Sequence, residues 1–167
     1  MRVSKHVLGM LIMLVLASLA CMQASAGALN EGQGTRDNPI APRKFARTGD
    51  YEIRALSTIR PVTADNYTAP EGFEFMKVQF EVKCTKSEAE ICDLTDLQNN
   101  IKVVSNTGIL YTADPETQLD KPLAGEILGG AADAGWLTYV VPVGMTIDQA
   151  LAQYGMDGAN LIFFKLP

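Results

Sequence analysis

Residues 75–84 read FMKVQFEVKC, and this stretch decides the fold class. Apolar side chains occupy every second position, and charged or amide side chains fill the positions between them. Because successive side chains of a β-strand point to opposite faces, the pattern predicts a strand with one buried and one wet face. The apolar face consists of Met76, Val78, Phe80, Val82 and Cys84. Cys84 should therefore be buried at the end of this strand.

Shorter stretches on both sides repeat the period of two between turn residues. The predicted strands cover residues 51–55, 100–105, 109–111, 125–130, 135–142 and 160–166, with Pro61 closing the first and residues 131–134 joining the fourth to the fifth. Asn106-Thr107-Gly108 predicts a hairpin turn in which Gly108 takes a positive φ. The last strand carries bulky apolar residues on both faces, so we expect it inside a sheet rather than at an exposed edge.

Only the segment from Thr146 to Tyr154 has the spacing of a helix, with Ile147, Ala150 and Leu151 completing one face and Thr146 as N-cap. The rest of the chain reads as about seven short strands with regular turns. This pattern predicts an all-β fold, a sandwich of two sheets. A small β-barrel is the alternative closure.

Residues 1–26 have the layout of an export signal. Arg2 and Lys5 precede an apolar run over residues 7–20, which is shorter than the roughly 20 residues of a bilayer span. Ala24-Ser25-Ala26 matches the small-residue pattern that signal peptidases cleave. Cleavage there would leave Gly27 as the first mature residue.

Cys21 offers a second cleavage position, because Leu19-Ala20-Cys21 is similar to the end of bacterial lipoprotein signals. Lipidation of Cys21 would tether the protein to a membrane, and without it no membrane contact is expected. In both cases the chain after the signal divides into a short leader, residues 27–36, and one domain, residues 37–167. The expected location is extracellular or in the cell envelope.

The charge of the mature chain disfavours two classes of partner. The whole chain has a formal charge of −5, and the predicted signal contains Arg2 and Lys5 but no acidic residue, so the remainder is near −7. An acidic domain gains nothing from nucleic-acid phosphates or anionic lipid headgroups. We therefore expect no nucleic-acid partner.

Histidine is absent after residue 26, because His6 is the only one in the chain. Its absence excludes Ser-His and Cys-His nucleophile pairs, the usual general base and the commonest transition-metal ligand. A glycosidase-like pair of carboxylates remains as a remote alternative. Its candidates lie in stretches typical of solvated loops: Glu88, Glu90, Asp93, Asp114 and Glu116. No calcium-binding loop pattern is present, and we predict no catalytic residue, metal or cofactor.

Cys84 and Cys92 are separated by seven residues in a chain that carries an export signal. In that context an isolated pair indicates a disulfide rather than a metal site or a redox centre. A closed ring of this size would stabilise the fold by about 2.6 kcal/mol through the chain entropy it removes from the unfolded state.

Six pieces of sequence carry a family resemblance. They are residues 34–39 (GTRDNP), 49–53 (GDYEI), 70–78 (PEGFEFMKV), 108–111 (GILY), 135–142 (GWLTYVVP) and 161–166 (LIFFKL). In this order and spacing they resemble the bacterial family of exported domains of unknown function that share the immunoglobulin-like fold of secreted immunoprotective antigens. The resemblance implies an immunoglobulin-like β-sandwich, secreted or lipid-anchored, with no catalytic residue to carry over. The chain departs from the family pattern at Pro42-Arg43-Lys44, where a glycine is expected.

Three aromatic residues are of interest for ligand contact. The alternating pattern around Trp136 favours a core anchor between the sheets over an exposed side chain for a ligand. Tyr67 and Phe73 belong to or flank a polar loop, and loops at the end of a sandwich usually carry binding residues. The leading hypothesis is an exported, non-catalytic interaction module with a protein or glycan partner. A passive, lipid-anchored envelope component is the alternative, and the oligomeric state is left open.

Overall fold

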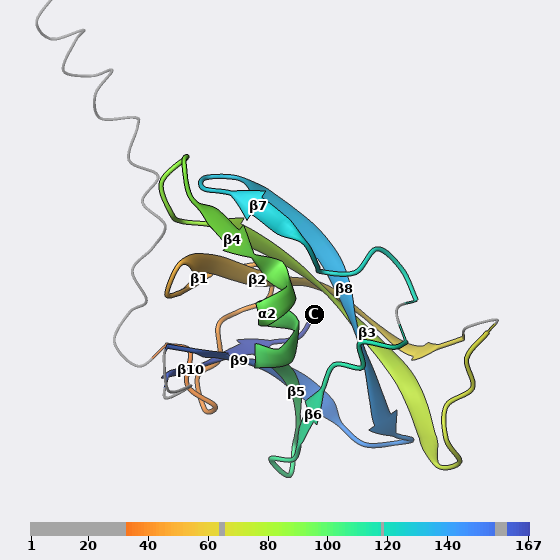
Figure 1. The fold of residues 1–167 in the computed structure, drawn as a ribbon. Helices are drawn as coiled ribbons and strands as arrows, with labels where there is room; N and C mark the ends of the chain where they lie inside the picture. The colour runs from red at the N-terminus through yellow and green to blue at the C-terminus, as the bar shows by residue number, and fades with distance from the viewer. Residues whose placement is uncertain (1–32, 64–65, 118, 156–159) are drawn as a thin grey trace, which may run out of the picture.

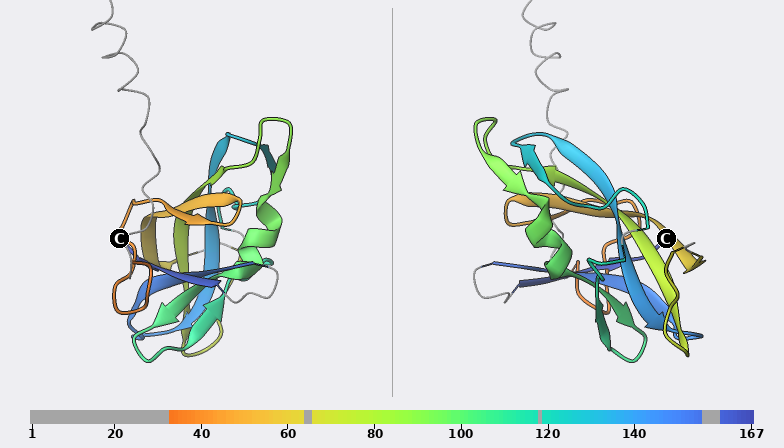
Figure 2. Two further views of the ribbon diagram at one scale, coloured as in Figure 1. Left: turned by 90° about the vertical axis from the view of Figure 1, so that its left-hand side faces the viewer. Right: turned by 45° about the vertical axis from the view of Figure 1, so that its right-hand side comes forward.

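The computed structural model describes residues 33–63, 66–117, 119–155 and 160–167. The predicted export signal and Cys21 lie outside the described residues. Two four-stranded antiparallel sheets pack against each other, and a two-stranded ribbon lies beside them (Figures 1 and 2). The predicted all-β sandwich is therefore confirmed.

The sheets follow the orders β1-β2-β3-β8 and β10-β9-β5-β6. The strands of the first sheet are β1 (Ala46–Thr48), β2 (Tyr51–Val62), β3 (Phe73–Cys84) and β8 (Ala132–Pro142). Those of the second are β5 (Ile101–Ser105), β6 (Leu110–Thr112), β9 (Ile147–Tyr154) and β10 (Asn160–Lys165). The ribbon pairs β4 (Ile91–Asp93) with β7 (Glu126–Leu128), and α2 (Leu94–Asn100) runs from the ribbon to β5 (Figure 1).

The strand read from residues 75–84 is β3, and its alternation is confirmed. All five side chains of its predicted apolar face, from Met76 to Cys84, are fully buried. β3 pairs with β2 on one side and β8 on the other, so its inner face lies at the centre of the core. Truncating a buried aromatic such as Phe80 to alanine would cost about 3–5 kcal/mol.

The predicted hairpin after β5 is also present. β5 and β6 pair antiparallel, and Gly108 in the connecting turn has a φ of 89°. A side chain at this φ would be strained, which explains the glycine.

The predicted helix over residues 146–154 is wrong, because this segment is β9. β9 lies between β10 and β5, so both neighbours satisfy its backbone groups. Ala150, Leu151 and Ala152 are all buried although they alternate between faces. A strand buried on both faces has consecutive apolar residues, and such a run is easily mistaken for the apolar stripe of a helix.

The helix that does form, α2, was missed by the sequence analysis. The Asp93 carboxylate caps it by accepting a hydrogen bond from the Thr95 backbone N–H at 2.7 Å. Leu94 and Leu97 face the core, and the buried Gln98 amide donates to the Leu123 carbonyl at 2.6 Å. Seven residues are too few to show a helical period.

The C-terminal strand β10 ends its sheet, so its expected interior position is wrong. Its free side is nevertheless covered by the chain that precedes β1. The Ile40 N–H donates to the Phe163 carbonyl, and the Lys165 N–H donates to the Ile40 carbonyl, both at 2.8 Å. The Phe163 N–H also donates to the Gly34 carbonyl at 2.8 Å. These bonds occupy the edge that would otherwise be open to another chain.

β2 continues through Pro61 to Val62, so the expectation that Pro61 closes the strand is also wrong. β1 pairs only with residues 51–53, and beyond them β3 is the one strand among the described residues that pairs with β2. A proline is tolerated there because its missing N–H can face the unpaired side. Residues 132–134, expected in a connection, likewise belong to β8.

Candidate functional site

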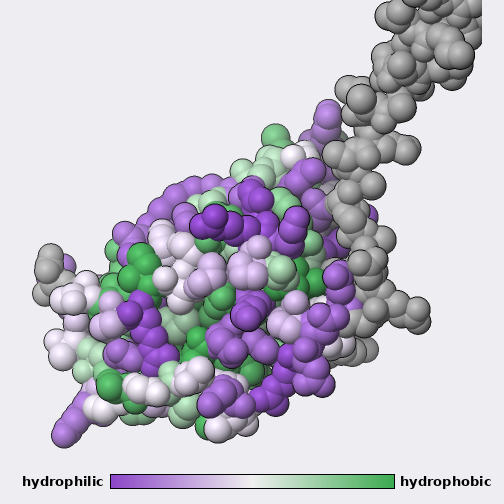
Figure 3. Space-filling model, turned by 180° about the vertical axis from the view of Figure 1, so that it is seen from behind, coloured by the Kyte–Doolittle hydropathy of each residue, from purple (hydrophilic) through white to green (hydrophobic). Residues whose placement is uncertain are grey.

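The binding residues predicted from sequence, Tyr67 and Phe73, lie on the surface, and each is 43 % exposed. Phe73 is the first residue of β3 and is paired with Pro142, the last residue of β8. Val143, beside it at the following turn, is 63 % exposed. On the face seen in Figure 3, green hydrophobic residues are interrupted by purple hydrophilic ones and form no continuous patch among the described residues.

The predicted disulfide between Cys84 and Cys92 is present, with the two Cα atoms 5.8 Å apart. Both cysteines are fully buried. The bond ties the end of β3 to β4 across the loop of residues 85–90. It therefore fixes the position of the short ribbon and of the N-cap of α2, which follows Cys92 directly.

Trp136 is not a core anchor, contrary to the favoured interpretation. It lies half-buried on the outer face of β8, because its neighbours Leu137 and Tyr139 take the inward positions. The Lys77 ammonium lies 4.7 Å from its ring centroid, and Lys77 is also paired with Asp120. The cavity beside Trp136 measures about 10 Å³, which holds no more than a water molecule.

Two of the carboxylates considered for catalysis, Glu90 and Asp114, serve local turns. Glu90 accepts hydrogen bonds from the hydroxyl and the backbone N–H of Ser87, and these bonds lower its pKa. Asp114 accepts from the Thr117 hydroxyl at 2.7 Å and from the Glu116 N–H at 3.0 Å. Glu88 is exposed in the same loop as Glu90. These contacts give Glu90 and Asp114 a structural task.

A hollow of about 610 Å³ opens at the end of the sandwich where β1 turns into β2, and we call it the end hollow. It is lined by residues 48–51 of this turn, by Asp96, Leu97 and Asn100 of α2, and by Gln153, Tyr154 and Gly155 at the end of β9. Tyr51 pairs with Cys84, whereas Phe73 begins the same β3 strand. The end hollow thus lies roughly 36 Å from the predicted binding loop, at about 3.3 Å per strand residue.

On the strands that line the end hollow, the face that points into the core changes from apolar to hydroxyl-bearing residues. Positions two apart on a strand share a face. On three strands an apolar core residue is followed at this spacing by a hydroxyl-bearing residue: Ala46 by Thr48 on β1, Ile53 by Tyr51 on β2, and Ala152 by Tyr154 on β9. The core therefore gives way to a polar, partly aromatic wall at this end.

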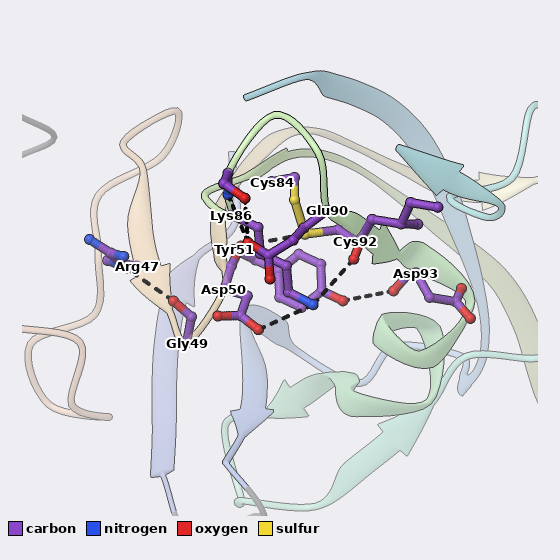
Figure 4. A network of polar contacts seen from close by, with 11 residues as sticks. Arg47, Gly49, Asp50, Tyr51, Cys84, Lys86, Glu90, Cys92 and Asp93 are labelled. Atoms are coloured by element: carbon purple, nitrogen blue, oxygen red, sulfur yellow. Dashed lines mark hydrogen bonds and ion pairs between the residues drawn. A yellow bond between two sulfur atoms is a disulfide. The ribbon is translucent and has the colours of Figure 1, made fainter. Parts of the chain in front are cut away.

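Tyr51 is held rigidly at the edge of the end hollow. Its hydroxyl donates a 2.9 Å hydrogen bond to the Asp93 carbonyl, and its ring packs against the core (Figure 4). Burial raises the pKa of Tyr51, and the carboxylates of Asp93, Asp96 and Asp50 raise it further. The hydroxyl therefore keeps its proton, and the three carboxylates place negative charge near it.

Several side chains that line the end hollow lack a protein partner for their polar groups. Thr48 is 1 % exposed, and its hydroxyl has no hydrogen-bond partner. Within the part of the chain that the structure describes, the side chains of Asp96, Gln153 and Tyr154 make no hydrogen bond or ion pair. The Asp50 carboxylate is 3.5 Å from the Lys86 ammonium (Figure 4). A buried hydroxyl without a partner costs about 1–3 kcal/mol, which a bound ligand could recover.

Two features are absent from the described ranges. Residues 33–63, 66–117, 119–155 and 160–167 contain no cluster of three or more His, Cys, Asp or Glu side chains placed to hold a metal ion. The helical part of the same ranges has no segment long and apolar enough to cross a membrane. The residues that line the end hollow offer hydrogen bonds, charge and aromatic surface.

No protein-family model matches the sequence, and no curated protein matches it. The fold is similar to solved structures. The yjhA protein of Bacillus subtilis has a TM-score of 0.55 at 10 % identity, covering 77 % of this chain and 99 % of its own. An uncharacterized β-sandwich protein of Clostridium difficile has a TM-score of 0.51 at 13 % identity, covering 84 % of this chain and 100 % of its own.

MPT63, a secreted protein of Mycobacterium tuberculosis, is similar as well. Its TM-score is 0.52 at 11 % identity, covering 76 % of this chain and 97 % of its own. At these identities the likeness shows the fold alone. It supports the resemblance found in the sequence at the level of a β-sandwich shared with a secreted bacterial protein.

Sequence reasoning missed the end hollow because its three walls are far apart along the chain. Gly49-Asp50 marks a turn and Tyr154-Gly155 ends a strand, but nothing local indicates that they meet. The misassignment of β9 as a helix removed one wall from consideration. A correct strand pairing of β9 with β5 would have placed Tyr154 beyond the same end of the core.

Proposed function

We propose that this chain is an exported, non-catalytic β-sandwich that binds a ligand in the end hollow. The observation that carries the proposal is the end hollow itself: about 610 Å³, walled by three separate segments and containing an unpaired buried hydroxyl. Its volume lies in the range of about 300–1,000 Å³ that is typical of ligand sites. Loops at the end of a rigid sandwich are also where such folds usually bind.

A binding role fits the chemistry better than a catalytic one. Hydrolysis by paired carboxylates needs one acid held in an apolar enclosure. Asp50 is instead 61 % exposed and paired with Lys86. Asp96, the other lining carboxylate, is exposed as well. The remaining polar groups of the end hollow are amides and hydroxyls, which orient a ligand without transferring protons readily at neutral pH.

Export is the second part of the proposal. It rests on the signal layout of residues 1–26, on the Cys84–Cys92 disulfide and on the likeness in fold to a secreted protein. Intact mass of the mature protein from its host tests it. A mass beginning at Gly27 supports a freely secreted module, a mass beginning at an acylated Cys21 supports a tethered one, and an unprocessed chain beginning at Met1 contradicts export.

The binding proposal is tested by filling the end hollow. Asn100 lines it from the last position of α2, whereas its neighbour Asn99 is exposed and outside the lining. Asn100→Trp and Asn99→Trp are therefore a matched pair. Protein-observed NMR with a library of small cationic, neutral and anionic compounds should show shifts at residues 48–51, 96–100 and 153–155. Asn100→Trp should abolish these shifts and Asn99→Trp should preserve them. Absence of any hit in this region, or equal behaviour of the two variants, contradicts the proposal.

A further inference from the structure

The charges around the end hollow are uneven. Asp50 and Asp96 line it, Asp93 lies beside it, and no Lys or Arg is among the lining residues. The cations nearby are already engaged within the protein. Arg47 is exposed on the opposite face of β1 and donates to the Gly49 carbonyl, and it points away from Tyr51 in Figure 4. Lys86 reaches Asp50 only at 3.5 Å and also donates to the Ile91 carbonyl.

Two tyrosine rings complete the lining. Tyr51 and Tyr154 both pack against the core and line the end hollow, one from each sheet. An aromatic ring attracts a cation held over its face, and the attraction grows as water is excluded. The hydrogen bond from Tyr51 to the Asp93 carbonyl fixes the first ring, so it loses little freedom when a ligand binds.

A third feature is independent of charge. The Thr48 hydroxyl is buried, lacks a partner and lies in the wall directly opposite Tyr51 across the β1–β2 pair. A hydroxyl can accept a hydrogen bond from an N–H donor of a ligand. The amide side chains of Asn100 and Gln153 add further acceptors at the rim.

We propose that the end hollow binds an organic cation, a ligand that carries a primary ammonium or guanidinium group on an apolar body. The charged group pairs with Asp96 and reaches the Thr48 hydroxyl, and the apolar body lies against Tyr51 and Tyr154. This assignment rests on the proposed binding function and adds the chemical class of the ligand. An anionic ligand would face Asp50, Asp93 and Asp96 without a lining cation to offset them.

Three probes of matched shape and different charge test the assignment: phenethylamine, 2-phenylethanol and 3-phenylpropionate, titrated into the full mature protein and followed by NMR. Phenethylamine should shift the residues that line the end hollow and saturate, and its affinity should fall as salt is raised. The alcohol and the carboxylate should bind at least about tenfold more weakly, the worth of one charge-assisted hydrogen bond.

The variant Asp96→Asn, compared with the control variant Asp148→Asn, tests whether the Asp96 carboxylate pairs with the cationic group of the ligand. Both changes remove one exposed carboxylate, but Asp148 lies at the start of β9, away from the end hollow. Asp96→Asn should weaken phenethylamine binding roughly tenfold while Asp148→Asn leaves it within about twofold. Equal effects of the two variants overturn the proposal.

The other outcomes separate the two proposals. Binding of the alcohol or the carboxylate in the end hollow as tight as that of the amine refutes the cation assignment and leaves the binding site standing. Binding of sugars or other neutral library compounds in the end hollow, without binding of the amine, would also refute the cation assignment and leave the binding site standing. No shift with any compound, together with no difference between Asn100→Trp and Asn99→Trp, refutes both.

Discussion

Removing the Cys84–Cys92 disulfide should destabilise the protein by at least about 2.6 kcal/mol. The ring spans a sequence separation of eight, and the chain entropy that it removes from the unfolded state sets this figure. The native state adds to the loss, because both cysteines are fully buried and alanine leaves unfilled space at each. In a domain of this size the change corresponds to a fall in Tm of about 8–10 °C.

The assay is urea denaturation of the Cys84→Ala/Cys92→Ala variant beside the oxidised wild type, with amide hydrogen exchange on both. Among the described strands β4 pairs only with β7, so exchange should accelerate first at residues 91–93 and at the N-terminus of α2. β3, paired on both sides, should keep its protection. A loss below about 1 kcal/mol would refute the reasoning, because it would mean that the loop is held by its other contacts.

Three further changes probe charge and backbone. Burial holds the pKa of Tyr139 far above its usual range. The folded state therefore keeps a proton that the unfolded chain loses above about pH 10, and stability should fall there by up to about 1.4 kcal/mol per pH unit. Tyr139→Phe should flatten this decline in urea denaturation between pH 10 and 11.5, and an unchanged slope would contradict it. Arg60→Ala should cost about 2–3 kcal/mol, because Arg60 and its partner Glu74 are only 18 % and 17 % exposed. Arg54→Ala, in a pair that is 31 % and 23 % exposed, should cost less than about 1 kcal/mol. Equal losses in chemical denaturation would show that burial does not set the difference. Arg43 has a φ of 63°, so Arg43→Gly should raise the free energy of unfolding by about 0.5–1 kcal/mol, and a decrease would show that the side chain contributes more than the strain.

The regular alternation of the central strand is the part of the fold that sequence reasoning predicts best. Residues 75–84 are buried on one face and bounded by clear turns, so period and burial agree. Gly108 in the 106–108 turn was predictable because it depends on local sequence. The disulfide was predictable because it depends on the spacing of the two cysteines and on the export signal. Arg43 has a positive φ within the stretch where the sequence resemblance led us to expect a glycine.

The errors arise where long-range packing decides the outcome. β9 reads as a helix because strands on both sides bury its two faces. β10 carries bulky apolar residues on both faces and was therefore predicted inside a sheet. It lies at the edge instead, where the segment around Ile40 covers it, and the sequence of β10 does not reveal this cover. Trp136 was predicted in the core because aromatic residues on strands are usually buried there. Its position on β8 places it on the outer face of the sheet instead.

The end hollow also depends on contacts between segments that are far apart in the sequence. Its walls come from β1–β2, α2 and β9, and α2 is too short to be seen in the sequence. The loop around Tyr67 and Phe73 was chosen by composition, and its role in binding stays a prediction. Only the strand order shows that Tyr51 and Tyr154 close the same end of the sandwich.

A crystal structure of the mature protein soaked with phenethylamine tests the central claim most directly. The account predicts density for the ring between Tyr51 and Tyr154, with the ammonium within hydrogen-bond distance of Asp96 or the Thr48 hydroxyl. Density at another surface with the end hollow unoccupied, at a concentration that saturates the protein in solution, would contradict it.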